Sequence, residues 1–360
     1  MEVQTCALPI SVTVLDKHPY DILISLRLRS LTGSETKVKE TYYLQQLEEE
    51  LIIALGCTEP VAVAYAAALA RKEAGYDDIE TIVVSASVNI FKNAMGVKIP
   101  GTEEMGVAMA AALGAVAGDP DRSLQVLENL QVKDVEAARS LIAAEKVMLE
   151  VSGSDPVLYI KVSVHTKSGS GSSVIAYKHD LVLELTRDDK LVYKNDMQLS
   201  QDLEDSLVED DIANIWEFAQ TVDLEKLDKV REALELNMKI ADAGLKDGYG
   251  IEVGPSIREQ ISRMSLSDYC ASRTAAAADA RMAGASYPVM GNSGSGNQGL
   301  TATVSVAAAA EYLNSSRETL LRAVTLSHLL AIHVKKAFGR LSPLCGAVPA
   351  SIGAAGGIVM

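Results

Sequence analysis

The sequence predicts an α+β fold, mainly helical with an inserted small antiparallel β subdomain. Apolar residues recur at helical spacing over 40–54, with glutamates on the opposite face. Between Lys146 and Tyr193 the apolar period changes to two, and Gly/Ser-rich and Asp-containing turns separate the runs. After an acidic segment, Asp202–Asp211, helical periodicity resumes. A β subdomain between two helical halves accounts for this order.

The individual elements follow from local periods and breaks. The first half is expected to contain helices at 40–54, 60–74, about 104–117 and 122–144, a strand at 79–88, and a loop with a short strand at 89–102. The second half is expected to contain helices at 212–221, 224–245, 254–265, 270–283, 299–313, 317–337 and from 343 onward. The predicted divisions are a first helical half at 40–145, the β subdomain at 146–200 and a second helical half at 201–360.

Both ends of the chain are atypical of a domain. The first forty residues form no clear amphipathic helix, although they contain a short alternating run from Tyr20 to Leu28. The last residues, Ala347–Met360, are a Gly/Ala-rich apolar run without a cap or polar tail. We therefore expect a C-terminally truncated domain, with a tucked C-terminus as the alternative.

The composition restricts the class of protein. A net charge of −15 argues against nucleic-acid binding, which requires clustered Lys and Arg. Asp16, Lys17 and His18 interrupt any signal-peptide core, and the longest uncharged apolar run, 105–118, is too short to cross a bilayer. We expect a cytoplasmic protein without membrane contact. Its four cysteines are widely spaced without a CxxC, which in a reducing compartment favours buried, catalytic or metal-bound thiols.

A cysteine immediately before a helix stands out in the segment Gly56-Cys57-Thr58-Glu59-Pro60. Proline suits the first helical position, so Thr58 or Glu59 is expected to cap the helix. Free backbone N–H groups and the helix dipole at this end favour a thiolate, which binds iron or attacks carbon. An inert buried cysteine at a helix break is the alternative.

A second segment, Gly291–Gly299, opens directly into an apolar helix. Its glycines permit close approach of a ligand, and its helix start provides an anion site. It is neither a Walker loop nor a Rossmann fingerprint, because it lacks Gly-Lys-Ser/Thr and no clear strand precedes it. A small carboxylate is the expected guest, and a flexible linker is the alternative. The polar side chains available to the guest are Asn292, Ser293, Ser295, Asn297 and Gln298.

A third segment, Gly339–Gly346, again places a cysteine, Cys345, at a Pro-marked helix start. The preceding helix carries His328 and Lys335, which are two helical turns apart and so share a face. A histidine on an apolar helix is more often a hydrogen-bonded core residue than a catalyst. The same alternative applies to His165 and His179 in the sheet region.

These segments, in this order, resemble the L-cysteine desulfidase family, the UPF0597 group, which is related to the α subunits of iron–sulfur serine dehydratases. The resemblance begins at about Glu40, so residues 1–39 form an unmatched leader. The matching motifs are Ala54–Pro60, Lys92–Val97 with Pro100–Thr102, Ala278–Met282, Asn292–Gly299, Ser327–Leu329 and Gly339–Gly346.

The resemblance implies a [4Fe-4S] cluster bound by three cysteines, without pyridoxal phosphate. Cys57 and Cys345 match two ligand positions, and the third family cysteine lies in a motif beyond Met360. Cys270 and Cys6 do not match it. Where the family carries a His-Thr-Asn-Ile-like element, this sequence keeps only His179.

The implied activity is that of a carbon–sulfur lyase with a mainly helical catalytic domain. It converts L-cysteine and water to sulfide, ammonia and pyruvate, with the open iron as Lewis acid. Thr58, Glu59 and the polar residues of the Gly291–Gly299 segment would bind the small amino acid, and Lys335 or His328 would act as base. The alternatives are an iron–sulfur L-serine ammonia-lyase and a non-catalytic amino-acid-binding relative. A homodimer is compatible with the sequence.

Overall fold

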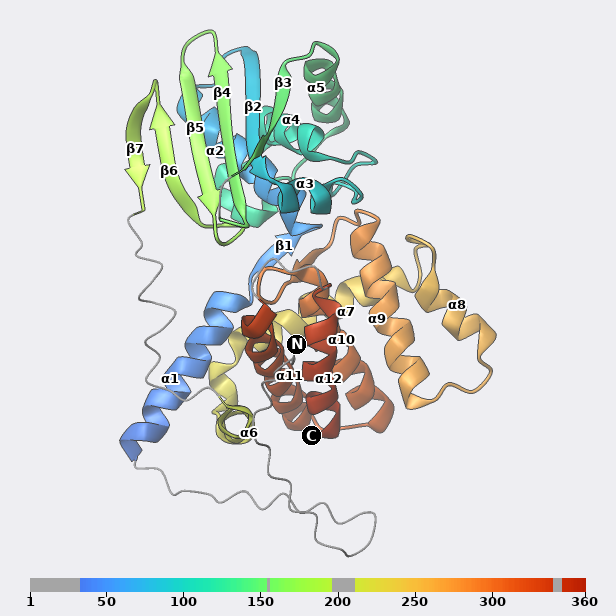
Figure 1. Ribbon diagram of the computed structural model, residues 1–360. Helices are drawn as coiled ribbons and strands as arrows, with labels where there is room; N and C mark the ends of the chain where they lie inside the picture. The colour runs from blue at the N-terminus through green and yellow to red at the C-terminus, as the bar shows by residue number, and fades with distance from the viewer. Residues whose placement is uncertain (1–32, 154–155, 196–210, 339–344) are drawn as a thin grey trace, which may run out of the picture.

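The computed structural model describes residues 33–153, 156–195, 211–338 and 345–360 and divides into two lobes (Figure 1). The upper lobe contains a six-stranded sheet covered by helices, and the lower lobe is a helical assembly. The predicted α+β class is therefore confirmed. Most of the predicted leader, with Cys6, and part of the Gly339–Gly346 segment lie outside the described residues.

The sheet of the upper lobe is mixed, with strand order β3-β2-β4-β5-β6-β7. Its strands are β2 (Ile79–Ser87), β3 (Val147–Ser152), β4 (Tyr159–Thr166), β5 (Ser170–Ala176), β6 (Val182–Arg187) and β7 (Lys190–Lys194). The predicted antiparallel pairing is found from β4 to β7, but β2 also joins this sheet and pairs parallel to β3, with Ile82 opposite Val147. The helices between these two strands supply the crossover that a parallel pair requires. The strand predicted at 79–88 thus belongs to the same sheet as 146–200.

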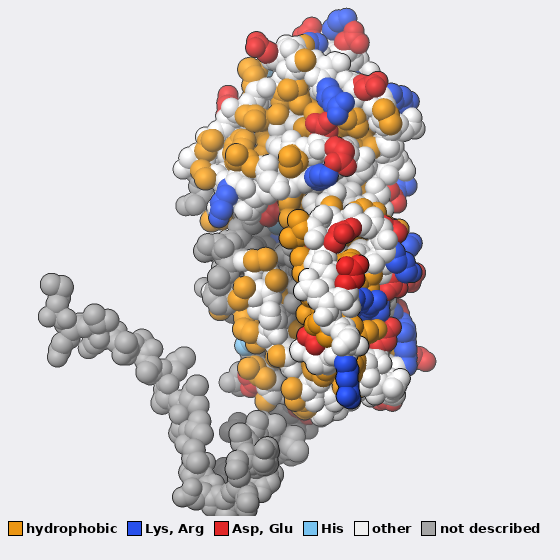
Figure 2. Space-filling view, turned by 90° about the vertical axis from the view of Figure 1, so that its right-hand side faces the viewer, with side chains coloured by type: hydrophobic (Ala, Val, Ile, Leu, Met, Phe, Trp, Pro, Cys, Tyr) orange, Lys and Arg blue, Asp and Glu red, His pale blue; other side chains and the backbone are white. Residues whose placement is uncertain are grey.

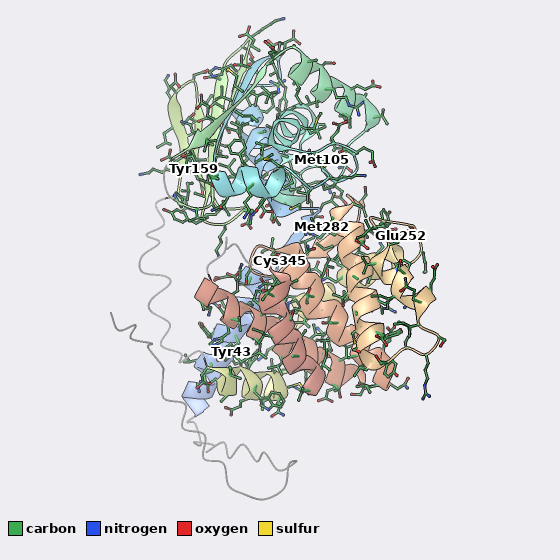
Figure 3. All side chains as sticks on the ribbon, turned by 45° about the vertical axis from the view of Figure 1, so that its right-hand side comes forward. Tyr43, Met105, Tyr159, Glu252, Met282 and Cys345 are labelled. Atoms are coloured by element: carbon green, nitrogen blue, oxygen red, sulfur yellow. The ribbon has the colours of Figure 1, made fainter. Side chains whose placement is uncertain are left out.

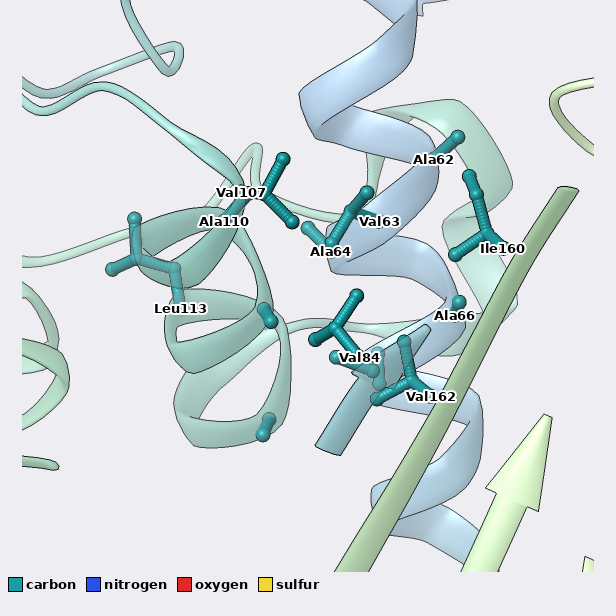
Figure 4. Close-up of a cluster of buried hydrophobic side chains, with 14 of the residues drawn as sticks. Ala62, Val63, Ala64, Ala66, Val84, Val107, Ala110, Leu113, Ile160 and Val162 are labelled. Carbon is teal, nitrogen blue, oxygen red and sulfur yellow. The ribbon is translucent and has the colours of Figure 1, made fainter. Parts of the chain in front are cut away.

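An alanine-rich helix, α2 (Thr58–Ala74), packs on this sheet and against α4 (Val107–Ala117). Figure 4 shows alanines of α2 between Val84, Ile160 and Val162 on one side and Leu113 on the other. At Gly114 an added Cβ would overlap the backbone of Ala64, so the two helices lie in close contact. Small side chains therefore provide the close packing of this core.

The lower lobe combines the first helix of the chain with the helices of the second half. They are α1 (Gly33–Glu50), α6 (Ile212–Thr221), α7 (Asp228–Gly244), α8 (Val253–Gln260), α9 (Leu266–Met282), α10 (Gly296–Leu313), α11 (Arg317–Phe338) and α12 (Ala347–Val359). The apolar stripe of α1, including Tyr43 and Leu47, packs with Leu51 just after the helix, with Phe218 of α6 and with neighbouring residues. The predicted second-half helices are confirmed to within a few residues.

Three local predictions were wrong. The first helix ends at Glu50 rather than Ala54, since Ile53–Leu55 forms strand β1 and pairs antiparallel with β8 (Pro288–Met290). The segment after β2 begins as the short helix α3 (Val88–Ala94) instead of a loop. Both segments are short and apolar, so their tertiary partners override their local periodicity. A third prediction, a single helix at 122–144, is also wrong, since Pro120–Gln125 is a 3₁₀ turn and α5 (Val132–Ala143) begins only after it. A further 3₁₀ turn lies at Leu224–Lys226.

The surface shows mixed charge. On the face in Figure 2, Lys and Arg side chains are interspersed with Asp and Glu over both lobes. The helices within the described ranges include none with the length and apolarity needed to span a membrane.

Candidate active site

The residue before Cys57 is Gly56, a position where no other residue type fits. Gly56 joins β1 to α2 with φ +73°, and a Cβ there would overlap the ring of Pro100. Cys57 then occupies the N-cap position of α2, without a side-chain capping bond. The predicted cap at Thr58 or Glu59 is therefore one or two residues too late, because both residues already lie in the helix.

Cys57 is 8% exposed, and its Sγ donates to Oε2 of Glu59 at 3.1 Å. Burial and then the Glu59 carboxylate raise the pKa of the Cys57 thiol to about 12, and the positive charge of Arg281 acts in the opposite direction. The helix end favours a thiolate, as the sequence indicated, whereas burial and Glu59 favour the thiol. A bound metal ion would reverse the balance, since coordination deprotonates a thiol.

Glu59 is the centre of a polar cluster contributed by the upper lobe. Its Oε1 accepts from Nδ2 of Asn93 in α3 at 3.0 Å, and Oε1 lies 4.0 Å from Nε2 of His179. His179 lies in the turn between β5 and β6 and is 3% exposed. Burial acts to raise the pKa of Glu59, but His179 and the hydrogen bonds from Cys57 and Asn93 outweigh it, so this pKa lies below its usual range. The cluster thus holds an ionised buried carboxylate beside an imidazole.

The Gly291–Gly299 loop connects β8 to α10 and is fixed by the chain that precedes Cys57. Gly291 N–H donates to the carbonyl of Ile52 at 2.9 Å, and Ser293 N–H donates to that of Glu50 at 3.0 Å. Ser295 is the N-cap of α10, and its Oγ accepts from the N–H of Gln298 at 3.3 Å. The loop therefore opens a helix as the sequence predicted, and its path is tied to the start of α2.

The two amide side chains of this loop belong to a buried hydrogen-bond network around His328. Nδ2 of Asn292 lies 2.9 Å from Nδ1 of His328, while Oδ1 of Asn292 accepts from Nε2 of Gln298 at 2.7 Å. On the other side of the ring, Nε2 lies 2.9 Å from Oγ1 of Thr303. Thr303 donates its own proton to the Gly299 carbonyl, so its oxygen accepts from the ring.

His328 is therefore a neutral imidazole protonated on Nε2. Its side chain is fully buried, and burial lowers its pKa to about 3. Both ring nitrogens of His328 form hydrogen bonds within the protein. His328 therefore fixes the Asn292 side chain, and Asn292 in turn fixes the Gly291–Gly299 loop. Ser293 is also buried and donates to Oδ1 of Asn292 at 2.9 Å.

Three consecutive loop residues are each contacted by a different candidate group. Oγ1 of Thr58, next to Cys57, donates to the Gly294 carbonyl at 3.1 Å. Gly346, next to Cys345, packs so closely on Ser295 that a Cβ would overlap its Oγ. At Gly296 a Cβ would overlap the guanidinium of Arg281. Both predicted ligand cysteines thus have an immediate neighbour on the segment Gly294–Gly296.

These contacts lie at the junction of the two lobes. In Figure 3, Cys345 and Met282 lie at the edge of the lower lobe that faces the upper lobe. Cys345 is exposed, whereas Cys57 is buried. The two cysteines therefore differ in solvent access although they approach the same loop.

Comparison with known proteins gives the family. Residues 121–360 match the serine dehydratase alpha chain family. The chain belongs to this family. Among relatives of this serine dehydratase alpha-family protein, a UPF0597 protein of Oleidesulfovibrio alaskensis is 44% identical over 88% of this chain and 75% of its own length. One from Chromobacterium violaceum is 40% identical over 88% of this chain and 74% of its own length. No solved structure matches. The resemblance predicted from the motifs is confirmed.

An iron–sulfur cluster would need cysteine ligands grouped at this site. Within the described part of the chain, no group of three or more His, Cys, Asp or Glu is arranged to hold a metal ion. Cys270 lies on α9, packed against Ala308 and Ala309, and does not join the site. Cys57 and Cys345 are thiols of the kind that bind such a cluster, and they match two of the three ligand positions that the resemblance implies.

The remaining predicted site residues lie as follows. Lys335 is 5% exposed on α11, the helix that carries His328. Asn297 accepts from Nη1 of Arg281 through its Oδ1 at 2.9 Å. A separate open depression of about 750 Å³ is lined by α7, α10 and the turn after α10, and includes none of the predicted site residues.

Three residues of the site had no role predicted from the sequence: Asn93, Arg281 and Thr303. Asn93 and Arg281 lie within motifs that carry the family resemblance, so the motifs located them without showing what they contact. Asn93 bonds to Glu59, which is 34 positions away in the sequence, and Arg281 bonds to Asn297, which is 16 positions away. Thr303 lies inside an apolar helix with no local signal.

Proposed function

We propose that this protein is a β-eliminating lyase of the L-cysteine desulfidase type. The reaction converts L-cysteine and water to hydrogen sulfide, ammonia and pyruvate. Removal of the Cα proton and loss of the β-sulfur give aminoacrylate, whose imine tautomer takes up water and releases ammonia. No pyridoxal phosphate takes part in the proposed reaction.

One observation carries the proposal. Residues adjacent to Cys57, residues adjacent to Cys345, and Arg281 all contact the segment Gly294–Gly296 at the lobe junction. A small amino acid there would lie between a helix N-terminus, which favours its carboxylate, and two cysteines. The Glu59–His179 cluster belongs to the same site through Cys57.

We assign the proton-transfer role to the Glu59–His179 pair. A carboxylate beside an imidazole orients the ring and stabilises the imidazolium formed when it takes a proton. His328 is disfavoured as the base, because both of its ring nitrogens are occupied and its pKa is about 3. Its proposed role is to position Asn292. Lys335 stays the alternative base.

Cys57 and Cys345 are the proposed protein ligands of a [4Fe-4S] cluster. When bound, such a cluster with an open iron supplies a Lewis acid to the substrate. Of the other predicted binding residues, Thr58 and Ser295 are proposed to shape the substrate position with the loop backbone. Asn292, Ser293 and Gln298 are proposed to fix that backbone.

Two other functions are supported by specific observations. The family match to serine dehydratase alpha chains favours an L-serine ammonia-lyase, which differs only in losing water instead of sulfide. The lack of a three-ligand group within the described residues favours a non-catalytic amino-acid-binding protein.

Anaerobic reconstitution separates these functions. The chain is incubated with iron and sulfide, bound iron is quantified, and pyruvate release is measured from L-cysteine and from L-serine. The proposed function predicts iron binding that is lost in C57S and C345S, and faster turnover of L-cysteine. C270S is the matched control, because Cys270 is as buried as Cys57 at 8% exposure but lies outside the site.

Faster turnover of L-serine would establish the ammonia-lyase instead. Amino-acid binding without iron or turnover would establish the non-catalytic protein. A C270S variant that loses iron as C57S does would refute the proposed ligand pair.

A further inference from the structure

Arg281, near the C-terminal end of α9, is a buried cation without a carboxylate partner. Its side chain is 4% exposed, yet no Asp or Glu of the described residues forms an ion pair with it. Its Nε is buried and has no hydrogen-bond acceptor. Its Nη1 donates to Oδ1 of Asn297 at 2.9 Å and contacts Sδ of Met282 at 3.6 Å. A buried guanidinium without a counter-charge destabilises the fold unless an anion binds to it.

A second buried arginine on the same helix shows the usual arrangement. Arg273 is 7% exposed, and its guanidinium pairs with Asp242 at 2.6 Å and Glu311 at 3.0 Å. The two arginines have similar burial, and only one has carboxylates of the chain beside it. Of these two arginines on α9, only Arg281 lacks a carboxylate partner.

The guanidinium of Arg281 lies against the first residue of α10. Position 296 is glycine, and a Cβ there would overlap Nε and Cζ of Arg281. The N-terminus of an 18-residue helix adds positive potential and free N–H groups to the same place. Thr58 and Gly346 contact the two preceding loop residues, so this positive region belongs to the candidate site.

We propose that Arg281 binds the α-carboxylate of the amino-acid substrate together with the N-terminus of α10. The proposal rests on the proposed function and adds the residue that recognises the acid group. The planar guanidinium matches a carboxylate with parallel N–H donors, and Asn297 holds it in orientation. The loop amides Asn292 and Gln298, which the sequence assigned to the carboxylate, hold the loop instead.

The test measures binding without turnover. L-alanine has no β-leaving group, and L-alaninamide is its uncharged-carboxyl counterpart, so calorimetric titration of both isolates the carboxylate contribution. The wild-type protein is expected to bind L-alanine about 10- to 100-fold more tightly than L-alaninamide, as for a charged hydrogen bond. In R281Q this affinity ratio is expected to fall to about one. R281K keeps the positive charge but lacks the paired N–H donors of the guanidinium, so it should retain only part of the ratio.

R273Q is the matched control and should keep the wild-type ratio. Equal binding of the two ligands by the wild type, or an unchanged ratio in R281Q, would overturn the role of Arg281 alone. The wild-type comparison needs no variant, so it decides even if R281Q does not fold. Failure of the wild type to bind either ligand would contradict the proposed function itself.

Discussion

His179 and His328 approach the candidate site from the two lobes, and their surroundings differ in kind. His179 faces the ionised carboxylate of Glu59 in the upper lobe. His328 lies between an amide and a hydroxyl in the lower lobe, with no charged group hydrogen-bonded to its ring. Both are buried. Burial alone therefore does not distinguish a histidine that holds a loop from one that faces a carboxylate, whereas the hydrogen-bonding and charged partners do.

The largest expected effect comes from breaking the lower-lobe network. H328L removes the partners of Asn292 and Thr303, and each unpaired buried polar group costs about 1–3 kcal/mol, so the free energy of unfolding should fall by about 2–5 kcal/mol. Urea denaturation followed by circular dichroism measures it. H165Q is the control, because His165 is exposed on β4. Equal losses in the two variants would argue against a structural role for this network.

In the upper lobe, a change of charge should affect turnover more than stability. E59Q keeps the shape of the side chain but removes the carboxylate beside His179, and proton transfer contributes about 100-fold or more to such reactions. We expect kcat for L-cysteine to fall by about 100-fold. E103Q is the control, since Glu103 is 81% exposed in a surface ion pair. Wild-type kcat in E59Q would remove Glu59 from the mechanism.

The pH dependence of stability should report His328. Its folded-state pKa is about 3, below the ordinary 6.5, so only the unfolded chain takes up a proton as pH falls between these values. This group's contribution to stability is thus complete above pH 6.5 and declines by about 1.4 kcal/mol per pH unit below it. Urea midpoints from pH 7 to pH 4.5 measure the decline. In H328Q the slope should be smaller by about one proton, and an unchanged slope would contradict the assignment.

The smallest expected effect distinguishes two helix caps. Ser295 caps α10 in the site, and Ser265 caps α9 outside it. S295A and S265A should each lower the free energy of unfolding by about 1 kcal/mol. Only S295A should also weaken L-alanine binding, because Ser295 lies between Gly294 and Gly296. Weaker binding in S265A as well would trace the effect to general destabilisation.

Sequence reasoning predicted the helices of the second half because they are long and strongly periodic. It failed at Ile53–Leu55 and Val88–Ala94, where a few apolar residues suit either helix or strand until a distant partner decides. The parallel pairing of β2 with β3 was missed for a related reason. The period of a strand shows which face is buried, not which strand lies beside it.

For the site, the motifs located Cys57, Cys345 and the Gly291–Gly299 loop, and the family they indicated is confirmed. They could not give the state of the Cys57 thiol, because burial and Glu59 together outweigh the helix end. Nor could they show that Arg281 lacks a carboxylate while Arg273 has two. Such differences depend on neighbours that are distant in sequence.

The hydrogen bond between Thr58 and Gly294 joins residues 236 positions apart, which has a consequence for the order of assembly in the cell. At a synthesis rate of about 5–20 residues per second, the ribosome adds Cys57 roughly 10–50 s before it adds the Gly291–Gly299 loop. During this interval α2 can pack with the sheet, but the loop that completes the site does not yet exist. The two proposed cofactor ligands, Cys57 and Cys345, are likewise synthesised at different times, so the proposed cofactor loading would follow the synthesis of Cys345.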